Sequence, residues 1–136
     1  DTKSISFQRP EKGVIVIEIK NLDGELIKTV EGETLRGADF SSCNLKRADF
    51  RGANLAGANF DHANCSGADF TGADLTKAVL AYAQLREAIL RRAILCGADM
   101  ERANLEKADI EGARIDRDTR MFKLRTDGAK GGWISK

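Results

Sequence analysis

The sequence contains few residue types that could carry catalysis or bind a metal. It has one histidine, His62, and three cysteines, Cys43, Cys65 and Cys96. An acid–base or nucleophilic site needs a nucleophile, a base and an orienting group in one pocket, and a zinc site needs clustered cysteine or histidine ligands. A histidine without a second histidine or a paired cysteine is typical of a solvated side chain. We therefore predict no catalytic, metal-binding or cofactor-binding residues and no enzymatic activity.

Acidic side chains recur at a fixed spacing and could in principle form a carboxylate site. Asp49, Asp69 and Asp109 are separated by multiples of twenty residues. Aspartate and asparagine also favour turns, because their side chains accept hydrogen bonds from nearby backbone N–H groups. The turn role accounts for all of these residues, so we interpret them as structural.

The size and charge of the chain restrict its possible partners. A length of 136 residues suits one domain, and the formal net charge is +1. Such a chain has no long-range field that would gather nucleic acid or an anionic membrane. No stretch reaches the roughly 18 apolar residues of a membrane-spanning helix. We expect a cytoplasmic location. Because the chain starts at Asp1 rather than at Met, a processed exported or lumenal form is the alternative.

A five-residue repeat positions all of these side chains. Every fifth residue from Leu35 to Ile115 is apolar, and the residue two positions before it is nearly always alanine. The apolar series is Leu35, Phe40, Leu45, Phe50, Leu55, Phe60, Cys65, Phe70, Leu75, Leu80, Leu85, Leu90, Leu95, Met100, Leu105, Ile110 and Ile115. We predict that both members of each repeat point inward, with Leu35, Phe40, Phe50, Phe60, Phe70, Leu75, Leu90 and Ile110 among the core residues. Glu33 departs from the alanine pattern at its start.

A period of five fits neither an α-helix nor a flat strand. Residues five apart lie about 140° apart around a helix, and they face opposite sides of a strand. A closed polygon with one side per repeat keeps them on the same side of a central axis. With four sides, Phe40 stacks under Phe60 and Phe50 under Phe70. The pattern therefore predicts a four-sided, all-β coil of twenty residues, repeated about four times over residues 33–117. It places Cys43 and Cys65 inside and Cys96 outside, in a chain that we assign to a reducing compartment.

The repeat resembles that of a known family. Segments such as Ala53-Asn54-Leu55-Ala56-Gly57 and Ala73-Asp74-Leu75-Thr76-Lys77 are similar to the A(D/N)LXX motif of pentapeptide-repeat proteins. The resemblance covers about residues 33–117. It implies a right-handed quadrilateral parallel β-helix of the Rfr type.

The two ends of the chain depart from the repeat. In residues 1–32 we predict a loosely ordered tail over residues 1–12 and then a β-hairpin, because a β-branched run from Val14 is followed by the turn signal Asp23-Gly24. The hairpin is expected to cap the first coil. In residues 118–136 the register stops. We predict a C-terminal cap or tail there, with a helical turn over residues 118–124 and with Phe122 and Trp133 docked on the last coil.

An apolar band is the main candidate interaction surface. The position before each large residue is usually Asp or Asn, but the third coil has Val79, Gln84, Ile89 and Ile94 there. These side chains should point outward, with Tyr82 nearby, and contiguous apolar surface often marks an interface. The alternative is that β-branched residues favour the strand and are singly exposed.

A weak basic strip accompanies this band. Arg86, Arg91 and Arg92 follow the apolar positions of the third coil, and further basic residues, Lys46, Arg47 and Arg51, lie two coils below. The strip could contact phosphate, but we interpret it as solvated charge, so nucleic acid is not the expected partner.

These observations favour a non-enzymatic protein-interaction or structural module. The expected partner is another protein or a second copy of the chain, with no cofactor and no membrane. The resemblance implies one alternative, because some family members imitate DNA and bind type II topoisomerases such as gyrase, conferring quinolone resistance. That activity needs dense negative charge on the outside, and the repeats here carry nearly balanced charge.

Overall fold

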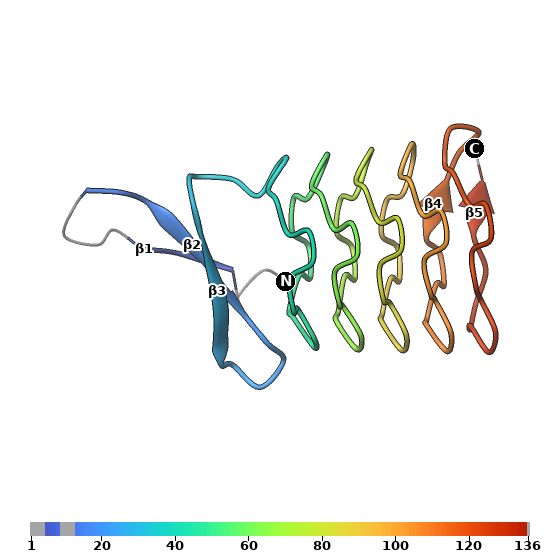
Figure 1. Cartoon of the computed structure of the whole chain (residues 1–136), viewed down its shortest axis with the longest axis horizontal. Helices are drawn as coiled ribbons and strands as arrows, with labels where there is room; N and C mark the ends of the chain where they lie inside the picture. The colour runs from blue at the N-terminus through green and yellow to red at the C-terminus, as the bar shows by residue number, and fades with distance from the viewer. Residues whose placement is uncertain (1–4, 9–12, 136) are drawn as a thin grey trace.

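The structure is a computed structural model that describes residues 5–8 and 13–135, with residues 6–8 described by their backbone alone. Three antiparallel strands, β1 (Ser6–Gln8), β2 (Val16–Lys20) and β3 (Leu26–Glu31), form a sheet in the order β1-β2-β3. Figure 1 shows this sheet at one end of a stack of loops, with β4 (Arg114–Ile115) and β5 (Ile134–Ser135) at the other end. Most of the loose tail expected over residues 1–12 lies outside the described residues, but residues 6–8 of it form β1, which pairs with β2.

The hairpin expected from the Asp-Gly signal is formed by β2 and β3. Its turn is held by Asn21, whose side-chain oxygen accepts hydrogen bonds from the backbone N–H groups of Asp23 and Glu25 at 2.9 and 3.0 Å. Alternation along β2 buries Ile17 and Ile19, which are 1% and 0% exposed. This alternation is the period of two that a half-buried strand requires.

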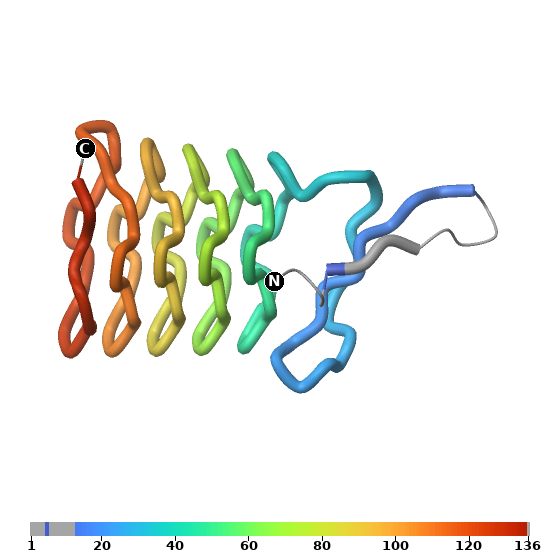
Figure 2. Tube along the Cα trace, turned by 180° about the vertical axis from the view of Figure 1, so that it is seen from behind, coloured from blue at the N-terminus to red at the C-terminus, as the bar shows by residue number. Residues whose placement is uncertain are grey.

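The hairpin covers the beginning of the stack. The backbone N–H of Asp49 donates to the carbonyl of Lys20 at 2.8 Å, and the N–H of Leu22 donates to the carbonyl of Arg47 at 2.8 Å. In the view from behind, the hairpin again lies at the end of the stack, beside its first loop (Figure 2). Both views place it where the open end of a repeat array needs protection.

The rest of the chain is a stack in which residues twenty apart pair through parallel β-bridges. We call each series of paired residues a column, and each stretch of twenty residues a level. The columns are Asp39, Asn59, Val79 and Asp99; Asn44, Asn64, Gln84 and Asn104; Asp49, Asp69, Ile89 and Asp109; and Asn54, Asp74, Ile94 and Arg114. The bridges use backbone hydrogen bonds of ordinary length, such as that from the Phe60 N–H to the carbonyl of Val79 at 2.7 Å.

A turn closes each five-residue unit. In one example the N–H of Ala58 donates to the carbonyl of Leu55 at 3.0 Å, and the intervening Gly57 has a φ of 70°. Several units carry a larger residue in the same left-handed conformation, among them His62 and Tyr82, each at φ 59°. Such a conformation costs roughly 1–2 kcal/mol for a residue with a side chain, so the stacked backbone bonds must offset this strain.

The core consists of the apolar series together with the alanines. Leu35, Phe40, Phe50, Phe60, Phe70, Leu75, Leu90 and Ile110 are all buried. The Phe40 ring stacks on Phe60 with centroids 5.0 Å apart, and Phe50 stacks on Phe70 at 5.2 Å. Neighbouring rings of the two pairs meet edge to face, an arrangement that aromatic rings favour.

The burial of the three cysteines depends on their place in the stack. Cys65 is buried, and burial raises the pKa of its thiol. Cys96 is half-buried on the outside. Cys43 was expected inside but is only half-buried, because it lies in the first level, which has no repeat before it.

The Asp and Asn residues of the columns shape the turns. In Asp69 and Asp74, one carboxylate oxygen accepts the backbone N–H and the hydroxyl of the threonine two residues later. Asn64 accepts the N–H of Ser66 in the same way at 3.2 Å. These local bonds are the turn role that the sequence assigns to the acidic series.

The stack continues beyond Ile115, and no helical turn forms over residues 118–124. Asp99, Asn104 and Asp109 pair with residues 21 positions later, and β4 pairs with β5 at a spacing of 20. The extra residue lies in a turn where Asp116 accepts the N–H groups of Gly97 and Asp118, both at 3.0 Å. One inserted residue therefore moves the repeat out of its sequence register without ending it.

Candidate interaction surfaces

The apolar band lies on the third level, residues 76–95. Val79, Ile89 and Ile94 are half-buried, whereas Gln84 is exposed. Ile89 lies between Asp69 and Asp109 in its column, and its side chain is only partly accessible. The band is therefore a ring of partly accessible apolar side chains and not a continuous apolar patch.

A shallow hollow lies beside Ile89. It has a volume of about 390 Å³ and is lined by Glu87, Ala88, Ile89, Lys107, Asp109, Gly128 and Lys130. This lining, with one isoleucine among charged groups of both signs, is typical of the rim of a protein interface. A small-molecule pocket has a mainly apolar lining.

The basic strip is largely neutralised by carboxylates. Arg86 pairs with Glu106 at 3.4 Å, and Arg91 pairs with Asp109 at 3.0 Å. Two coils below, Arg51 binds both oxygens of Asp49 at 2.9 and 2.6 Å, and Arg47 pairs with Asp23. Arg92 is exposed and has no ion pair among the described residues. Guanidinium groups already held by carboxylates are poorly placed to bind phosphate.

The Asp109 carboxylate provides a test of these ion pairs through pH. Burial raises the pKa of Asp109, but the N–H of Glu111 and the charges of Arg91 and Lys130 outweigh burial and lower the pKa overall. A lowered folded-state pKa stabilises the fold above the unfolded value of about 3.9, and this stabilisation disappears as the pH falls through the folded value.

We expect Asp109→Asn to keep the turn and lose the ion pair. Asparagine occupies equivalent positions in the neighbouring column, for example at Asn104, where it accepts the N–H of Glu106 at 2.9 Å. The free energy of unfolding should fall by less than about 1 kcal/mol at pH 7, with no difference from the wild type near pH 2. Urea titrations at several pH values measure this. A difference that persists unchanged at pH 2 would show that the ion pair is not its cause.

The corner beside Val79 carries an exposed aromatic pair. The rings of His62 and Tyr82 stack with centroids 4.7 Å apart and planes 7° apart, and Tyr82 is 44% exposed. His62 Nδ1 also lies 3.0 Å from a carboxylate oxygen of Asp61. The histidine thus has an aromatic and an acidic neighbour but no nucleophile to activate.

The two residues assigned to the C-terminal cap behave differently. Trp133 is half-buried and packs against the end of the core, together with Met121 and Leu124. Phe122 does not cover the core but lies outside it and is 57% exposed. The reason is the shifted register, which places Met121 and not Phe122 after the paired residue Arg120.

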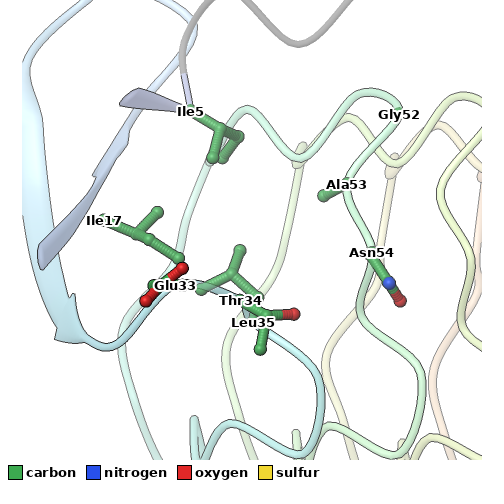
Figure 3. A pocket seen from close by; sticks show the side chains of 8 residues that line it. All are labelled: Ile5, Ile17, Glu33, Thr34, Leu35, Gly52, Ala53 and Asn54. Atoms are coloured by element: carbon green, nitrogen blue, oxygen red, sulfur yellow. The ribbon is translucent and has the colours of Figure 1, made fainter. Parts of the chain in front are cut away.

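A small cavity of about 200 Å³ lies between the hairpin and the first level. Figure 3 shows Ile5 and Ile17 on its hairpin side and Ala53 and Asn54 on its repeat side, with Glu33 between them. Glu33 stands where the later repeats have alanine, and this departure coincides with the opening. The sequence could not reveal the cavity itself, because it depends on how the hairpin sits over the repeats.

Two further features are absent from the described residues. Among them, no group of three or more His, Cys, Asp or Glu side chains could hold a metal ion. Within the same residues, no helix is long and apolar enough to cross a membrane.

The stacked columns and filled core define a solenoid repeat protein whose unit is five residues. The model of the family of pentapeptide repeats matches residues 34–64, 53–92 and 83–117, in eight copies. The chain belongs to the pentapeptide-repeat family, and the resemblance read from the sequence is confirmed. It is a β-helix solenoid.

Known structures of the same family include a pentapeptide-repeat protein from the thylakoid lumen of Arabidopsis thaliana. It is 38% identical over 71% of this chain and 59% of its own length, with a TM-score of 0.46. A pentapeptide-repeat protein of Nostoc PCC 7120 is 32% identical over 68% of this chain and 84% of its own, with a TM-score of 0.44. The chain thus spans about three fifths of the Arabidopsis protein. No curated protein matches the chain.

A more distant structure is QnrB1, a plasmid-mediated fluoroquinolone resistance protein. Its full-length form is 19% identical over 72% of this chain and 67% of its own, with a TM-score of 0.33.

Proposed function

We propose that the chain is a non-enzymatic protein-interaction or structural module whose binding surface includes the apolar band. One observation carries this proposal. The third level replaces the turn-forming Asp or Asn with Val79, Ile89 and Ile94, although its core is as well filled as that of the other levels. Such a replacement gives up the local turn bonds of the other levels and leaves partly accessible apolar side chains, which a partner could cover.

The proposed binding surface extends from the band to its neighbours. Tyr82 provides an exposed aromatic ring in one turn of the third level, and Arg86, Arg91 and Arg92 provide exposed guanidinium groups in the two turns that follow. Aromatic residues and arginine are enriched at the centres of protein interfaces. The partner is then another protein or a second copy of the chain, and neither nucleic acid nor a membrane.

The architecture that presents this surface is, in our proposal, a right-handed quadrilateral β-helix of about four coils. Residues 1–32 form its N-terminal tail and hairpin cap, residues 33–117 the repeats, and residues 118–136 the C-terminal cap. The twenty-residue spacing of the bridges supports four sides of five residues each. In this division the last segment closes the solenoid by stacking on it in the shifted register.

The double variant Ile89→Asp/Ile94→Asp tests the surface. Aspartate occupies the same columns at Asp69 and Asp74, so the variant is expected to fold. Proteins that the immobilised wild-type chain captures from the source cell's lysate should be lost by the variant, in quantitative mass spectrometry, by tenfold or more, since about 1.4 kcal/mol suffices for that factor.

The matched control adds two carboxylates elsewhere. Leu26→Asp/Thr29→Asp changes two exposed positions of β3 and should leave capture unchanged. Equal capture by all three chains would refute the band as the binding surface. Equal loss in both variants would assign the effect to added negative charge and not to the band.

The alternative function is a DNA-mimicking protein that binds a type II topoisomerase such as gyrase, as the quinolone-resistance type does. We consider it the weaker proposal, because Asp49, Glu106 and Asp109 are each paired with an arginine. Carboxylates in such pairs present little net negative field to a DNA-binding surface. We propose a cytoplasmic location, with a processed exported or lumenal form as the alternative; the unpaired state of all three cysteines agrees with a reducing compartment.

A further inference from the structure

One corner of the solenoid carries a row of exposed residues that differs from the other corners. His62, Tyr82, Arg102 and Lys123 occupy the same left-handed turn position in successive levels, with φ values of 59°, 59°, 60° and 55°. We call them the corner row. Backbone N–H groups of the first three donate to the next level at 3.0, 2.9 and 2.8 Å, so the row advances by one strand spacing, about 4.8 Å, at each step.

The two halves of the corner row have opposite chemistry. The half nearer the hairpin is aromatic and acidic, because His62 stacks on Tyr82 and lies 3.0 Å from a carboxylate oxygen of Asp61. The other half is cationic around one ring, because the Arg102 guanidinium lies 5.6 Å and the Lys123 ammonium 5.4 Å from the centre of the Phe122 ring.

The residues of both halves are accessible. Tyr82 and Phe122 are 44% and 57% exposed, and the side chain of Asp61 is 42% exposed. Arg102 and Lys123 have no ion pair among the described residues. The row thus presents two unpaired cations at one end and an aromatic–acidic pair at the other, at equal distances from its midpoint.

We propose that this corner row binds the same row of a second copy of the chain, in antiparallel orientation about a two-fold axis between Tyr82 and Arg102. Equal spacing then places Arg102 of each copy against the Tyr82 ring of the other, and Lys123 against the Asp61–His62 pair. A two-fold interface requires a self-complementary surface, and an aromatic–acidic half facing a cationic half provides it through cation–π and ion-pair contacts.

Other arrangements fit the row less well. In a parallel pairing, Arg102 would face Arg102 and Lys123 would face Lys123, which like-charge repulsion opposes. An anionic partner such as single-stranded nucleic acid would meet Asp61 at one end of the row. The antiparallel pair leaves no like charges opposed at these four levels.

The proposal specifies the partner within the protein-interaction role proposed above, on which it rests. A charge exchange tests it with the purified chain alone. The single variant Asp61→Lys places two positive charges opposite each other, and the single variant Lys123→Asp places two negative charges there. Because the dimer is symmetric, each repulsion occurs twice, and each variant should weaken association about tenfold or more. The double variant Asp61→Lys/Lys123→Asp restores opposite charges and should associate within about threefold of the wild type.

Sedimentation velocity between about 10 μM and about 1 mM chain measures the dissociation constants of these variants. The matched control is Arg117→Asp/Asp118→Lys, which exchanges a base and an acid at two exposed positions in a turn of another corner. It should leave association unchanged. The exchanged positions tolerate substitution, since the chain itself has Ser41, Ala81 and Glu101 where Asp61 stands in other levels.

Two results would overturn the proposal. One is a wild-type chain that stays monomeric up to about 1 mM; the other is association that the double exchange fails to restore while far-ultraviolet circular dichroism shows it folded. Neither result bears on the apolar band, because that test captures other proteins from a lysate and leaves the corner row intact. If the band variant lost capture but still self-associated normally, the apolar band and the corner row would be shown to act independently.

Discussion

Replacing Phe60 by alanine should destabilise the solenoid by about 3–5 kcal/mol, the usual cost of removing a buried phenylalanine. The Phe60 ring is 0% exposed. It stacks on Phe40 at 5.0 Å and meets the edges of Phe50 and Phe70 at 5.7 and 5.8 Å. The surrounding rings belong to stacked backbone levels that hold them in place, so little can move in to fill the space. Urea unfolding followed by circular dichroism measures the loss.

Phe122→Ala is the matched control, since it removes the same ring from the surface. Phe122 is 57% exposed and contacts Arg102 and Lys123 through its faces. Loss of these contacts should cost only about 0.5–1 kcal/mol. The measurement is made at low micromolar concentration so that association does not contribute. Equal losses in the two variants would contradict the assignment of Phe60 to the core and Phe122 to the surface.

The repeat could be predicted from the sequence because its cause is local. An apolar residue at every fifth position, with alanine two positions earlier, already specifies which side chains share the interior. The alternation of phenylalanine and leucine then specified the stacking partner, and Phe40 indeed lies against Phe60. Side-chain volume alone carries this information, since a narrow core accepts only certain neighbours.

The last level could not be predicted by counting residues. One inserted residue before Thr119 moves the pairing of Arg120, Arg125 and Lys130 to a spacing of 21, and the spacing returns to 20 at Ile134. The core position after Arg120 therefore falls on Met121, and Phe122 lies outside the core. The structure accommodates the insertion because Thr119 donates its hydroxyl to the carbonyl of Leu95 at 2.9 Å, and Asp116 accepts N–H groups of two levels. A bulge of this kind depends on contacts between levels, which no local pattern records.

The candidate surfaces were predictable only in part, for a similar reason. The sequence identifies Ile89 and Ile94 as departures from the Asp/Asn pattern. It does not show that Arg91 reaches Asp109, 18 residues later, and so neutralises part of the basic strip. Likewise His62 looked isolated in the sequence, although Tyr82 stacks on it from the next level. Contacts between levels join residues about twenty apart, and long side chains decide which of them meet.

Ile19→Ala should produce the second large effect, a loss of about 2–5 kcal/mol, because it removes part of the lid over the first level. Ile19 is 0% exposed and, with Ile17, belongs to the core cluster that the repeats form. The hairpin is attached to the repeats through the Asp49 and Leu22 backbone bonds as well. Removing the apolar contact leaves these bonds to hold it, and backbone hydrogen bonds contribute only about 1 kcal/mol each.

Hydrogen exchange distinguishes the loss of the cap from a general weakening. In a repeat array each level is stabilised mainly by its neighbours, so the Asp49 and Leu22 amides should exchange fastest in the Ile19→Ala variant. The Ile89 amide, bonded to the carbonyl of Ala68 at 2.9 Å, should be protected longer. Leu26→Ala, on the exposed face of the same hairpin at 54% exposure, should change neither set. If Leu26→Ala had the same effect, strand pairing within the hairpin and not coverage of the core would be what protects the first level.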